Sequence, residues 1–370
     1  MAVELSFLKK LAIPKFSLGL LIHKNSQIVG IDIGVYSAKV VQLKYEKERA
    51  ILETYGELLS EGYFKNVSTA SGGGFLRYMD ADIADMLKNL LREARITAPE
   101  AVFSIPATAS FVTTIPFPKL NPQEIEAALP YEARKYVPIP IAEVVLDWEM
   151  IETEEGANSK VLLVAVPKEV TEKFKRIAKL IGVRLKALEV ETFSMTRSLI
   201  GLDPTPTAII NLGHLSTTLA IVDKKQLRLS HNFGYGSQKL TNALEKGLGV
   251  TKDKAETIKR EIGLSEKIEE KEIVSIFEPI IENLFSEIER IIVIYNRKAP
   301  RKIQKVNLTG GGANLKGLID YTSTKLGVEV TKGNPFARTI APAFLQSILR
   351  DIGPSFGVAA GLALHGLTNH

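Results

Sequence analysis

The feature that most constrains the fold of this chain is the stretch Ile28–Leu43, which reads IVGIDIGVYSAKVVQL. Two apolar runs flank the segment from Asp32 to Ser37, which predicts two β-strands joined by a turn that contains a glycine. Glycine tolerates a positive φ angle and lets backbone N–H groups approach a ligand. An acid at the end of the first strand and a hydroxyl in the turn suit a phosphate bound together with a metal ion. Taken alone the pattern is weak, because buried hairpins with a glycine in the turn are common.

A second copy of the pattern occurs at Thr207–Val222, which reads TAIINLGHLSTTLAIV. Aligning the two copies places Asn211 on Asp32, Gly213 on Gly34, Ser216 on Ser37 and Thr218 on Lys39. A repeat separated by much of the chain predicts two similar halves that face each other, each contributing one hairpin.

A third element, Val306–Ala313, reads VNLTGGGA. A strand that ends in three glycines offers a surface without side chains, against which a flat base or a ribose can lie. Three phosphate or nucleotide signals in this order are far more specific than any one of them alone.

Hydrophobic periodicity predicts the elements around these motifs. Helices are expected at Asp80–Arg95, Pro122–Lys135, Lys168–Ile181, Thr192–Ile200, Gln238–Gly247, Ala255–Ile262, Lys267–Asn296 and Asn314–Leu326. Further strands are expected at Ala50–Leu59, Val102–Ile105, Phe111–Phe117, Val144–Glu152, Lys160–Val166 and Gly327–Val330. Asn121 is the expected N-cap of the helix that begins at Pro122. Ser60–Phe75 is expected to be a mobile loop, and Pro354–Gly366 to pack back on the first half.

These three motifs and several other segments resemble those of a known family. Asp32-Ile-Gly34, Asn211-Leu-Gly213 and Gly310-Gly-Gly312 are similar to the phosphate-one, phosphate-two and adenosine motifs of the actin-like ATPase superfamily. Within it, the chain from about Gln27 onward resembles the PilM family of type IV pilus assembly proteins, relatives of the cell-division protein FtsA. Tyr131–Pro140, Val145–Trp148 and Phe103–Pro106 resemble segments of that family rather than general actin segments.

The resemblance implies an α/β protein with the actin-like ATPase fold: duplicated ribonuclease-H-like domains with an FtsA-type inserted subdomain 1C, an SHS2 domain. The expected division is an N-terminal arm at 1–26, subdomain 1A at 27–97, 185–206 and 340–370, subdomain 1C at 98–184, subdomain 2A at 207–235 and 303–339, and subdomain 2B at 236–302. In this division the strand Val102–Ile105 and the helix Lys168–Ile181 belong to the inserted block. A block in this position argues against sugar kinases and heat-shock chaperones, whose insertions differ.

The resemblance also implies ATP and Mg²⁺ as ligands, with Asp32 holding the magnesium through water. The implied nucleotide-binding residues are Gly34, Val35, Tyr36, Ser37 and Lys39 in the first hairpin, Asn211, Gly213, His214, Ser216, Thr217 and Thr218 in the second, Glu256 and Lys259 on a helix, and Gly310, Gly311, Gly312 and Ala313 after the last strand. For Glu256 and Lys259, a solvated helical face with ordinary charges fits equally well.

Hydrolysis of ATP is expected to be weak or absent. The superfamily pattern has an aspartate at the second hairpin that helps to manage the metal and the attacking water, whereas this chain has Asn211, which carries no negative charge. PilM-like sequences commonly carry asparagine there. Glu191 falls near the position of a water-activating residue in polymerising relatives and is the candidate catalytic residue, although an acid at a helix start explains it as well.

Composition limits the other classes of function. With 45% hydrophobic and 24% charged residues among 370, the chain is expected to be globular with more than one core. The absence of cysteine excludes disulfides and thiolate metal sites. The net charge of +5 is modest and no basic stripe with interleaved aromatics occurs, so no nucleic-acid partner is expected.

The segment 1–26 is an unusual N-terminal arm. Leu5, Leu8 and Ala12 share one helical face, and Pro14 interrupts the pattern. Two interpretations stay open: an arm packed on its own domain, and an amphipathic segment that touches lipid or a partner helix. No apolar run reaches the ~18 residues of a spanning helix, and no signal-peptide cleavage site is seen.

The function implied by the resemblance is that of an ATP-binding scaffold of type IV pilus biogenesis, cytoplasmic and peripheral to the inner membrane through its partners. The implied partner is the N-terminal cytoplasmic tail of PilN, bound between subdomains 1A and 1C, with Tyr131–Pro140 as one wall. Other inner-membrane pilus assembly proteins and ATPases, and self-association, are further implied partners. Two alternatives remain: an FtsA-like cytoskeletal filament protein and a small-molecule kinase of the same superfamily.

Overall fold

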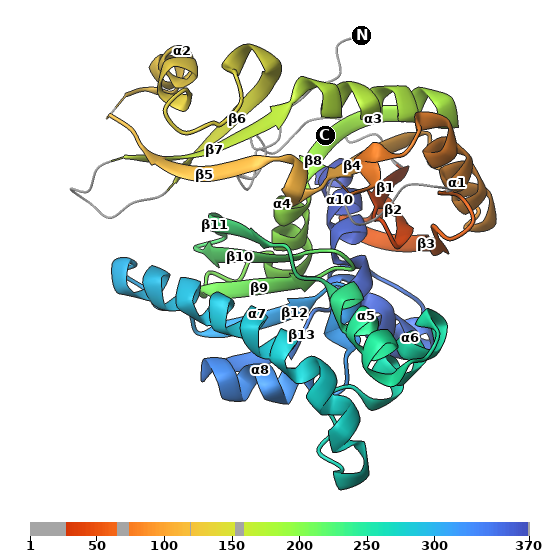
Figure 1. Cartoon of the computed structure of the whole chain (residues 1–370). Coiled ribbons are helices and arrows are strands. Elements are labelled where there is room, and N and C mark those ends of the chain that lie inside the picture. The colour runs from red at the N-terminus through yellow and green to blue at the C-terminus, as the bar shows by residue number, and fades with distance from the viewer. Residues whose placement is uncertain (1–26, 65–73, 119, 152–158, 369–370) are drawn as a thin grey trace.

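The computed structural model describes residues 27–64, 74–118, 120–151 and 159–368 (Figure 1). Over these residues the strands form two five-stranded sheets and one three-stranded sheet. The N-terminal arm, the centre of the Ser60–Phe75 loop and the segment 152–158 between two of the expected strands lie outside the described residues.

The first sheet has the strand order β3-β2-β1-β4-β8. Its strands are β1 (Gln27–Ile33), β2 (Ser37–Glu46), β3 (Arg49–Leu59), β4 (Glu100–Ile105) and β8 (Arg184–Val190). The strand β2 pairs antiparallel with both β1 and β3, whereas β4 pairs parallel with both β1 and β8.

The second sheet repeats this arrangement in the order β11-β10-β9-β12-β13. Its strands are β9 (Thr207–Leu212), β10 (Thr217–Asp223), β11 (Gln226–Phe233), β12 (Lys305–Thr309) and β13 (Glu329–Lys332). Again three strands are antiparallel and the last two are parallel to the first strand of the hairpin. The expectation of two similar halves is therefore confirmed by topology as well as by the sequence repeat.

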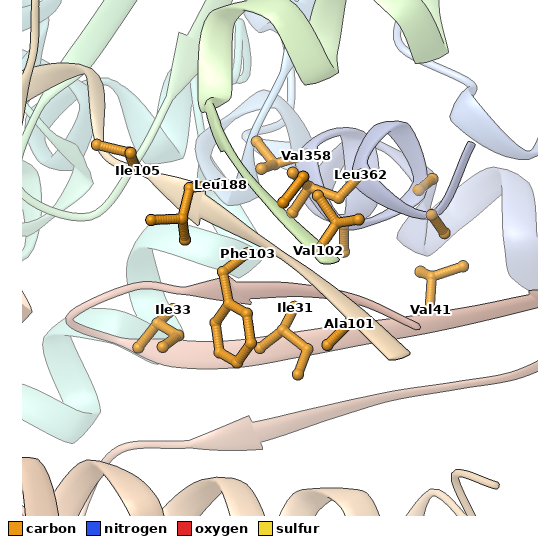
Figure 2. Close-up of a cluster of buried hydrophobic side chains, with 14 of the residues drawn as sticks. Ile31, Ile33, Val41, Ala101, Val102, Phe103, Ile105, Leu188, Val358 and Leu362 are labelled. Carbon is orange, nitrogen blue, oxygen red and sulfur yellow. The ribbon is translucent and has the colours of Figure 1, made fainter. Parts of the chain in front are cut away.

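Helices cover both faces of the first sheet. Its long helices are α1 (Asp80–Glu93), α3 (Lys168–Ile181) and α10 (Gly357–Thr368). Because side chains alternate along a strand, Val102 and Phe103 point to opposite faces. Figure 2 shows Val102 on the same side of β4 as Val358 and Leu362 of α10, with Phe103 on the other side. There the Phe103 ring lies 5.9 Å from that of Phe174 on α3. The C-terminal segment thus packs on the first half, as predicted.

Helices of the second half pack mainly on one face of its sheet. They are α5 (Ser237–Leu248), α6 (Lys252–Ile262), α7 (Lys271–Lys298) and α8 (Leu318–Leu326). Ala208 and Ile210 of β9 share a core with Phe277 and Phe285 of α7, whereas Ile209 between them belongs to the core of the first half. The predicted α8 begins later than expected, because Gly317 before it has a φ of +75°.

The connection between the halves is α4 (Glu191–Met195), which continues as a π-helical turn, Thr196–Ile200. Glu189, just before it, is fully buried and accepts two hydrogen bonds from Arg197 at 2.6 and 2.7 Å. Its carboxylate also lies 2.9 Å from His365 of α10. Burial alone would raise the pKa of Glu189, but Arg197 and His365 hold it well below its usual range. This ion cluster ties the last helix to the connection.

The inserted block contains β5 (Phe111–Pro116), α2 (Pro122–Ala133), β6 (Val144–Ile151) and β7 (Lys160–Pro167). Its three strands are antiparallel in the order β5-β7-β6, with a core of their own beneath α2. The predicted helix start is confirmed, since Asn121 and Glu124 form a reciprocal capping box.

One part of the predicted block lies elsewhere. The strand Val102–Ile105 is the centre of β4, which pairs with β1 and β8 in the first sheet, and α3 packs against β4 and α1. The assignment of these two elements to the inserted block was therefore wrong. Apolar periodicity shows that a strand is buried but does not show which sheet it joins. The finer division of the chain into subdomains stays a prediction.

The remaining elements are short. The helix α9 spans Gln346–Ile352. Turns of 3₁₀ helix lie at Gly74–Arg77, Ala107–Ala109, Ile141–Glu143, Ile268–Glu270, Gly311–Asn314, Pro335–Arg338, Ala343–Leu345 and Gly353–Phe356.

Candidate functional site

The two predicted phosphate turns have the same geometry. Asp32 pairs with Lys39 across the first hairpin, and Asn211 pairs with Thr218 across the second. In each turn the glycine N–H donates to a serine carbonyl three residues later, at 3.0 Å in both copies. The positions matched by sequence alignment are therefore also equivalent in three dimensions.

The reason for glycine in these turns differs from the expected one. Neither Gly34 nor Gly213 has a positive φ. Instead, a Cβ at Gly34 would lie 3.0 Å from the carbonyl oxygen of Ser37, and one at Gly213 would lie 2.9 Å from that of Ser216. The contact at Gly34 would be tighter than nine in ten real Cβ contacts, and the one at Gly213 is of a kind that real Cβ atoms essentially never make. Glycine is needed because each turn closes tightly on itself.

The two turns meet in space. The rings of Tyr36 and His214 have centroids 4.9 Å apart. On the far side, Arg260 of α6 donates a hydrogen bond to the Tyr36 hydroxyl at 3.2 Å. Burial, helped by the charges of Lys259 and Lys252, lowers the pKa of His214 to about 4. The imidazole beside Tyr36 is therefore neutral at physiological pH.

Two partly buried carboxylates lie behind these turns. Asp32 accepts a hydrogen bond from Ser104 at 2.7 Å. Glu191 accepts from the backbone N–H of Ala107 at 3.0 Å, and its other close neighbour is the Thr218 hydroxyl at 3.4 Å. Burial, together with the nearby charge of Asp32, raises the pKa of Glu191 to about 7. Glu191 therefore connects the two halves at the level of the hairpins.

These carboxylates fit a magnesium ion. Burial raises the pKa of Asp32 too, so a cation would relieve the cost of two ionised acids in one buried place. Mg²⁺ is usually held by one or two carboxylates together with waters and substrate phosphates. In the described part of the chain, no group of three or more histidine, aspartate or glutamate side chains is arranged to hold a metal. Asp32 is the residue that would hold the ion, with Glu191 nearby.

The polar groups of the first hairpin form a chain. Lys39 donates to the Ser37 hydroxyl at 2.7 Å, and Ser37 donates to Glu57 of β3 at 2.6 Å. Lys39 also lies 3.2 Å from the same Glu57 oxygen. The structure thus brings the ammonium and hydroxyl predicted for phosphate together, but pairs them with a carboxylate.

In the second hairpin the threonine hydroxyls donate hydrogen bonds to groups of the same half. Thr217 is fully buried and donates to the backbone carbonyl of Tyr235 at 2.7 Å. Thr218 donates to Asn232 of β11 at 2.7 Å. From this hairpin the turn residues, rather than the hydroxyl of Thr217, are the groups left for a phosphate.

The predicted residues on α6 bond to each other. Lys259 donates to Glu256 at 2.6 Å, and its side chain is only 8% exposed. Burial would raise the pKa of Glu256, but hydrogen bonds from Lys259, Thr241 and Arg260 outweigh it and lower the pKa to about 2. The solvated face considered for these two residues is thus ruled out for Lys259, while the neighbouring Arg260 reaches the first hairpin.

The backbone of Gly310–Gly312 packs closely against the second hairpin. Gly310 has a φ of +82°, and a Cβ there would lie 2.4 Å from Asn211 Oδ1. A Cβ at Gly312 would lie 2.8 Å from the Leu212 Cβ. At Gly311 a Cβ would make only an ordinary contact, 3.9 Å from the Ser355 hydroxyl, so this glycine is the least crowded of the three. Ala313 is buried.

Several residues at the site escaped the sequence reasoning. They are Glu57, Ser104, Asn232, Gly236 and Arg260. A Cβ at Gly236 would lie 2.3 Å from the His214 carbonyl oxygen, so Gly236 supports the second turn. The two glycines that flank Tyr235 in the sequence could have indicated a tight backbone approach at Gly236. Glu57, Asn232 and Arg260 reach the site only through strand pairing and helix docking, which no local motif reveals.

Comparison with protein-family models gives a match over most of the chain. The model described as "Type IV pilus assembly protein PilM" matches residues 30–367. The chain belongs to this family. The resemblance drawn from the hairpins and the Tyr131–Pro140 segment is therefore confirmed at the level of the family.

Solved structures support the same fold. A chain of a "PilM-PilN type IV pilus biogenesis complex" superposes with a TM-score of 0.78 at 24% identity, covering 92% of this chain and 98% of that one. The ethanolamine utilization protein EutJ from Carboxydothermus hydrogenoformans gives 0.54 at 16% identity, covering 91% and 89%. MreB5 of Spiroplasma citri bound to ADP gives 0.51 at 13%, covering 92% and 95%. The chain has the predicted α/β, actin-like ATPase fold.

Length and hydropathy of the helices bear on membrane insertion. Across the residues that the structure describes, none of the helices is both long and apolar enough to cross a bilayer.

Proposed function

We propose that this PilM-family protein is an ATP-binding scaffold that binds the N-terminal cytoplasmic tail of PilN at the inner membrane. The observation that carries the proposal is the meeting of two hairpins of identical register, with Glu191 between them and Asp32 behind the first turn. Triphosphates need donors from two sides and a cation between their oxygens.

The nucleotide role is supported by the chemistry of the chain's own residues. Backbone amides of Val35 to Ser37 and of His214 to Ser216 would hold phosphate oxygens, and Lys39 would supply charge. Gly311, the least crowded of the three glycines, would face the adenosine. When bound, Mg²⁺ would neutralise the phosphate charge, with Asp32 as its protein contact.

We expect turnover to be weak or absent. The second hairpin presents Asn211 where an acid would strengthen the hold on the metal. Glu191, whose pKa is raised to about 7, would suit a general base, since a base that titrates near neutral pH is well matched to proton transfer. ATP would then act by ordering the two halves into a conformation that a partner recognises.

The partner is supported by family membership and by one structural neighbour, which is described as a PilM-PilN complex. An extended peptide can add to a strand edge and place alternate side chains in apolar pockets. Tyr131 and Tyr136, in the segment proposed as one wall of the peptide site, are 69% and 38% exposed. Tyr131 also lies beneath the Arg134 guanidinium, 5.5 Å from its ring centre.

The nucleotide proposal is tested by calorimetric titration of the purified protein with ATP and Mg²⁺. Lys39→Ala should weaken binding by about tenfold or more, because it removes a charge-assisted contact to phosphate. Lys44→Ala is the matched control, since Lys44 lies on the same strand but pairs with Glu46. Equal affinity of Lys39→Ala and wild type would overturn the predicted site. Brisk magnesium-dependent turnover would contradict the expectation for Asn211.

The partner proposal is tested by anisotropy with a labelled PilN-tail peptide, with and without ATP and Mg²⁺. Tyr131→Ala should weaken peptide binding and leave nucleotide binding unchanged. Transfer of phosphate to a small molecule without peptide binding would favour the kinase alternative instead. Nucleotide-dependent filaments without peptide binding would favour the FtsA-like alternative.

A further inference from the structure

Glu57 bonds to the two side chains, Ser37 and Lys39, that are predicted to bind phosphate. It lies on β3, directly opposite Lys39 in the strand register. Its Oε1 atom accepts the Ser37 hydroxyl at 2.6 Å and lies 3.2 Å from the Lys39 ammonium. One carboxylate oxygen thus takes both the hydroxyl and the charge that a phosphate oxygen would need.

The burial of the three groups is unequal. Ser37 is buried, the Lys39 side chain is 14% exposed, and the Glu57 side chain is 37% exposed. The donors are therefore fixed, and the acceptor is the group nearest to solvent. A ligand that arrives from solvent meets the Glu57 charge first.

The negative charge of Glu57 also affects the pKa of two other residues at the site. Burial raises the pKa of Asp32, and the negative charge of Glu57 adds to that rise. Hydrogen bonding to Glu256 raises the pKa of Arg260, and Glu57 contributes in the same direction. Glu57 therefore acts on the metal-binding candidate and on the α6 residue that contacts Tyr36.

We propose that Glu57 is an internal counter-anion that competes with the terminal phosphate of the nucleotide for Ser37 and Lys39, and so sets the affinity for ATP relative to ADP. This inference rests on the proposed nucleotide site. A simple cross-strand ion pair would also join Lys39 and Glu57. The two roles differ in sign: a competitor weakens nucleotide binding, whereas an ion pair that only positions Lys39 strengthens it.

The deciding variant is Glu57→Gln, which keeps the acceptor oxygen for Ser37 and removes the charge. Like charges a few ångströms apart in a half-exposed site repel enough to change affinity by about 3- to 10-fold. ATP should therefore bind about 3- to 10-fold more tightly to Glu57→Gln than to wild type, with a smaller gain for ADP, as measured by calorimetry with Mg²⁺.

The matched control is Glu53→Gln, which removes the same charge from the same strand, about 13 Å farther from the turn. It should leave both affinities unchanged. Unchanged or weaker ATP binding by Glu57→Gln would overturn the competitor role while leaving the nucleotide site intact. Absence of ATP binding by both wild type and Glu57→Gln would instead overturn the proposed function, and this inference with it.

Discussion

Tyr36 stacks obliquely on His214, with ring centroids 4.9 Å apart and the planes inclined by 33°. The two residues come from the equivalent turns of the two halves, so the repeat that is visible in the sequence closes on itself in space. Arg260 adds a hydrogen bond to the Tyr36 hydroxyl from α6. Together these contacts hold the halves together at the predicted phosphate turns.

The ring of Tyr36 should matter more than its hydroxyl. Tyr36→Phe should change the free energy of unfolding by only about 0.5 kcal/mol, because an exposed hydrogen bond has a small net value. Tyr36→Ala should cost about 1–2 kcal/mol, because it also removes the aromatic contact with His214. Urea denaturation measures both values. Equal losses for the two variants would show that the bond to Arg260, and not the ring, joins the halves.

Glu191 should make the ligand-free protein less stable as the pH rises. Its pKa is about 7 in the folded state against an ordinary 4.5, so between these values the folded protein keeps a proton that the unfolded chain has released. The free energy of unfolding should therefore fall with pH across this window, by roughly 1–3 kcal/mol in total. At pH 8 Glu191→Gln should be more stable than wild type by a similar amount.

The Glu191 effect is best taken as the difference between wild type and Glu191→Gln at each pH. His214 works in the opposite direction, since its lowered pKa removes stability as the pH falls from 6.5 to about 4. That contribution is shared by both proteins and cancels in the difference. If the stability difference between the two proteins does not grow between pH 5 and pH 8, the pKa of Glu191 is not raised in the folded state.

A carboxylate at the second hairpin should make the site dependent on metal. Asn211 lies opposite Thr218, whose hydroxyl is 3.4 Å from Glu191. Asn211→Asp therefore adds a third acid to a place that already holds two. With EDTA it should lose about 1–2 kcal/mol of stability. Mg²⁺ with ATP should restore the loss in thermal denaturation, and indifference of the variant to Mg²⁺ would count against a metal site here.

Much of this arrangement was predictable because it is encoded locally. The Asp32 and Asn211 hairpins have the same spacing of acid or amide, glycine and hydroxyl, and the structure repeats their register. The helix from Pro122 was fixed by a cap, a first-turn proline and an early acid. In such cases the residues that determine an element lie within it.

The remainder depended on contacts distant in sequence. β11 was not predicted, because His231 interrupts the alternation of Leu227, Leu229 and Phe233 and the strand's position is set by pairing with β10. The strand β4 was predicted but placed in the wrong sheet. Ser104 at its end was quoted only as part of a family segment, and its bond to Asp32 appears once β4 is placed beside β1.

β11 also connects the second hairpin to the inserted block. Near one end, Asn232 accepts a hydrogen bond from Thr218. At the other end, Gln226 donates to Glu149 of β6 and to the Met150 carbonyl, each at 3.0 Å. Figure 1 shows β11 running beside β5 of the block, where the Thr114 hydroxyl donates to the Arg228 carbonyl at 3.2 Å.

A change at Gln226 should separate nucleotide binding from its effect on the inserted block. Gln226→Ala removes two hydrogen bonds, at a cost of about 1–3 kcal/mol in stability, but touches no predicted nucleotide contact. Affinity for ATP should stay the same, while the protection from hydrogen exchange that ATP produces in β5 and β6 should shrink. Gln346→Ala, on α9, is the matched control and should retain that protection. Full protection of β6 in Gln226→Ala would mean that the bonds from Gln226 to β6 do not carry the coupling.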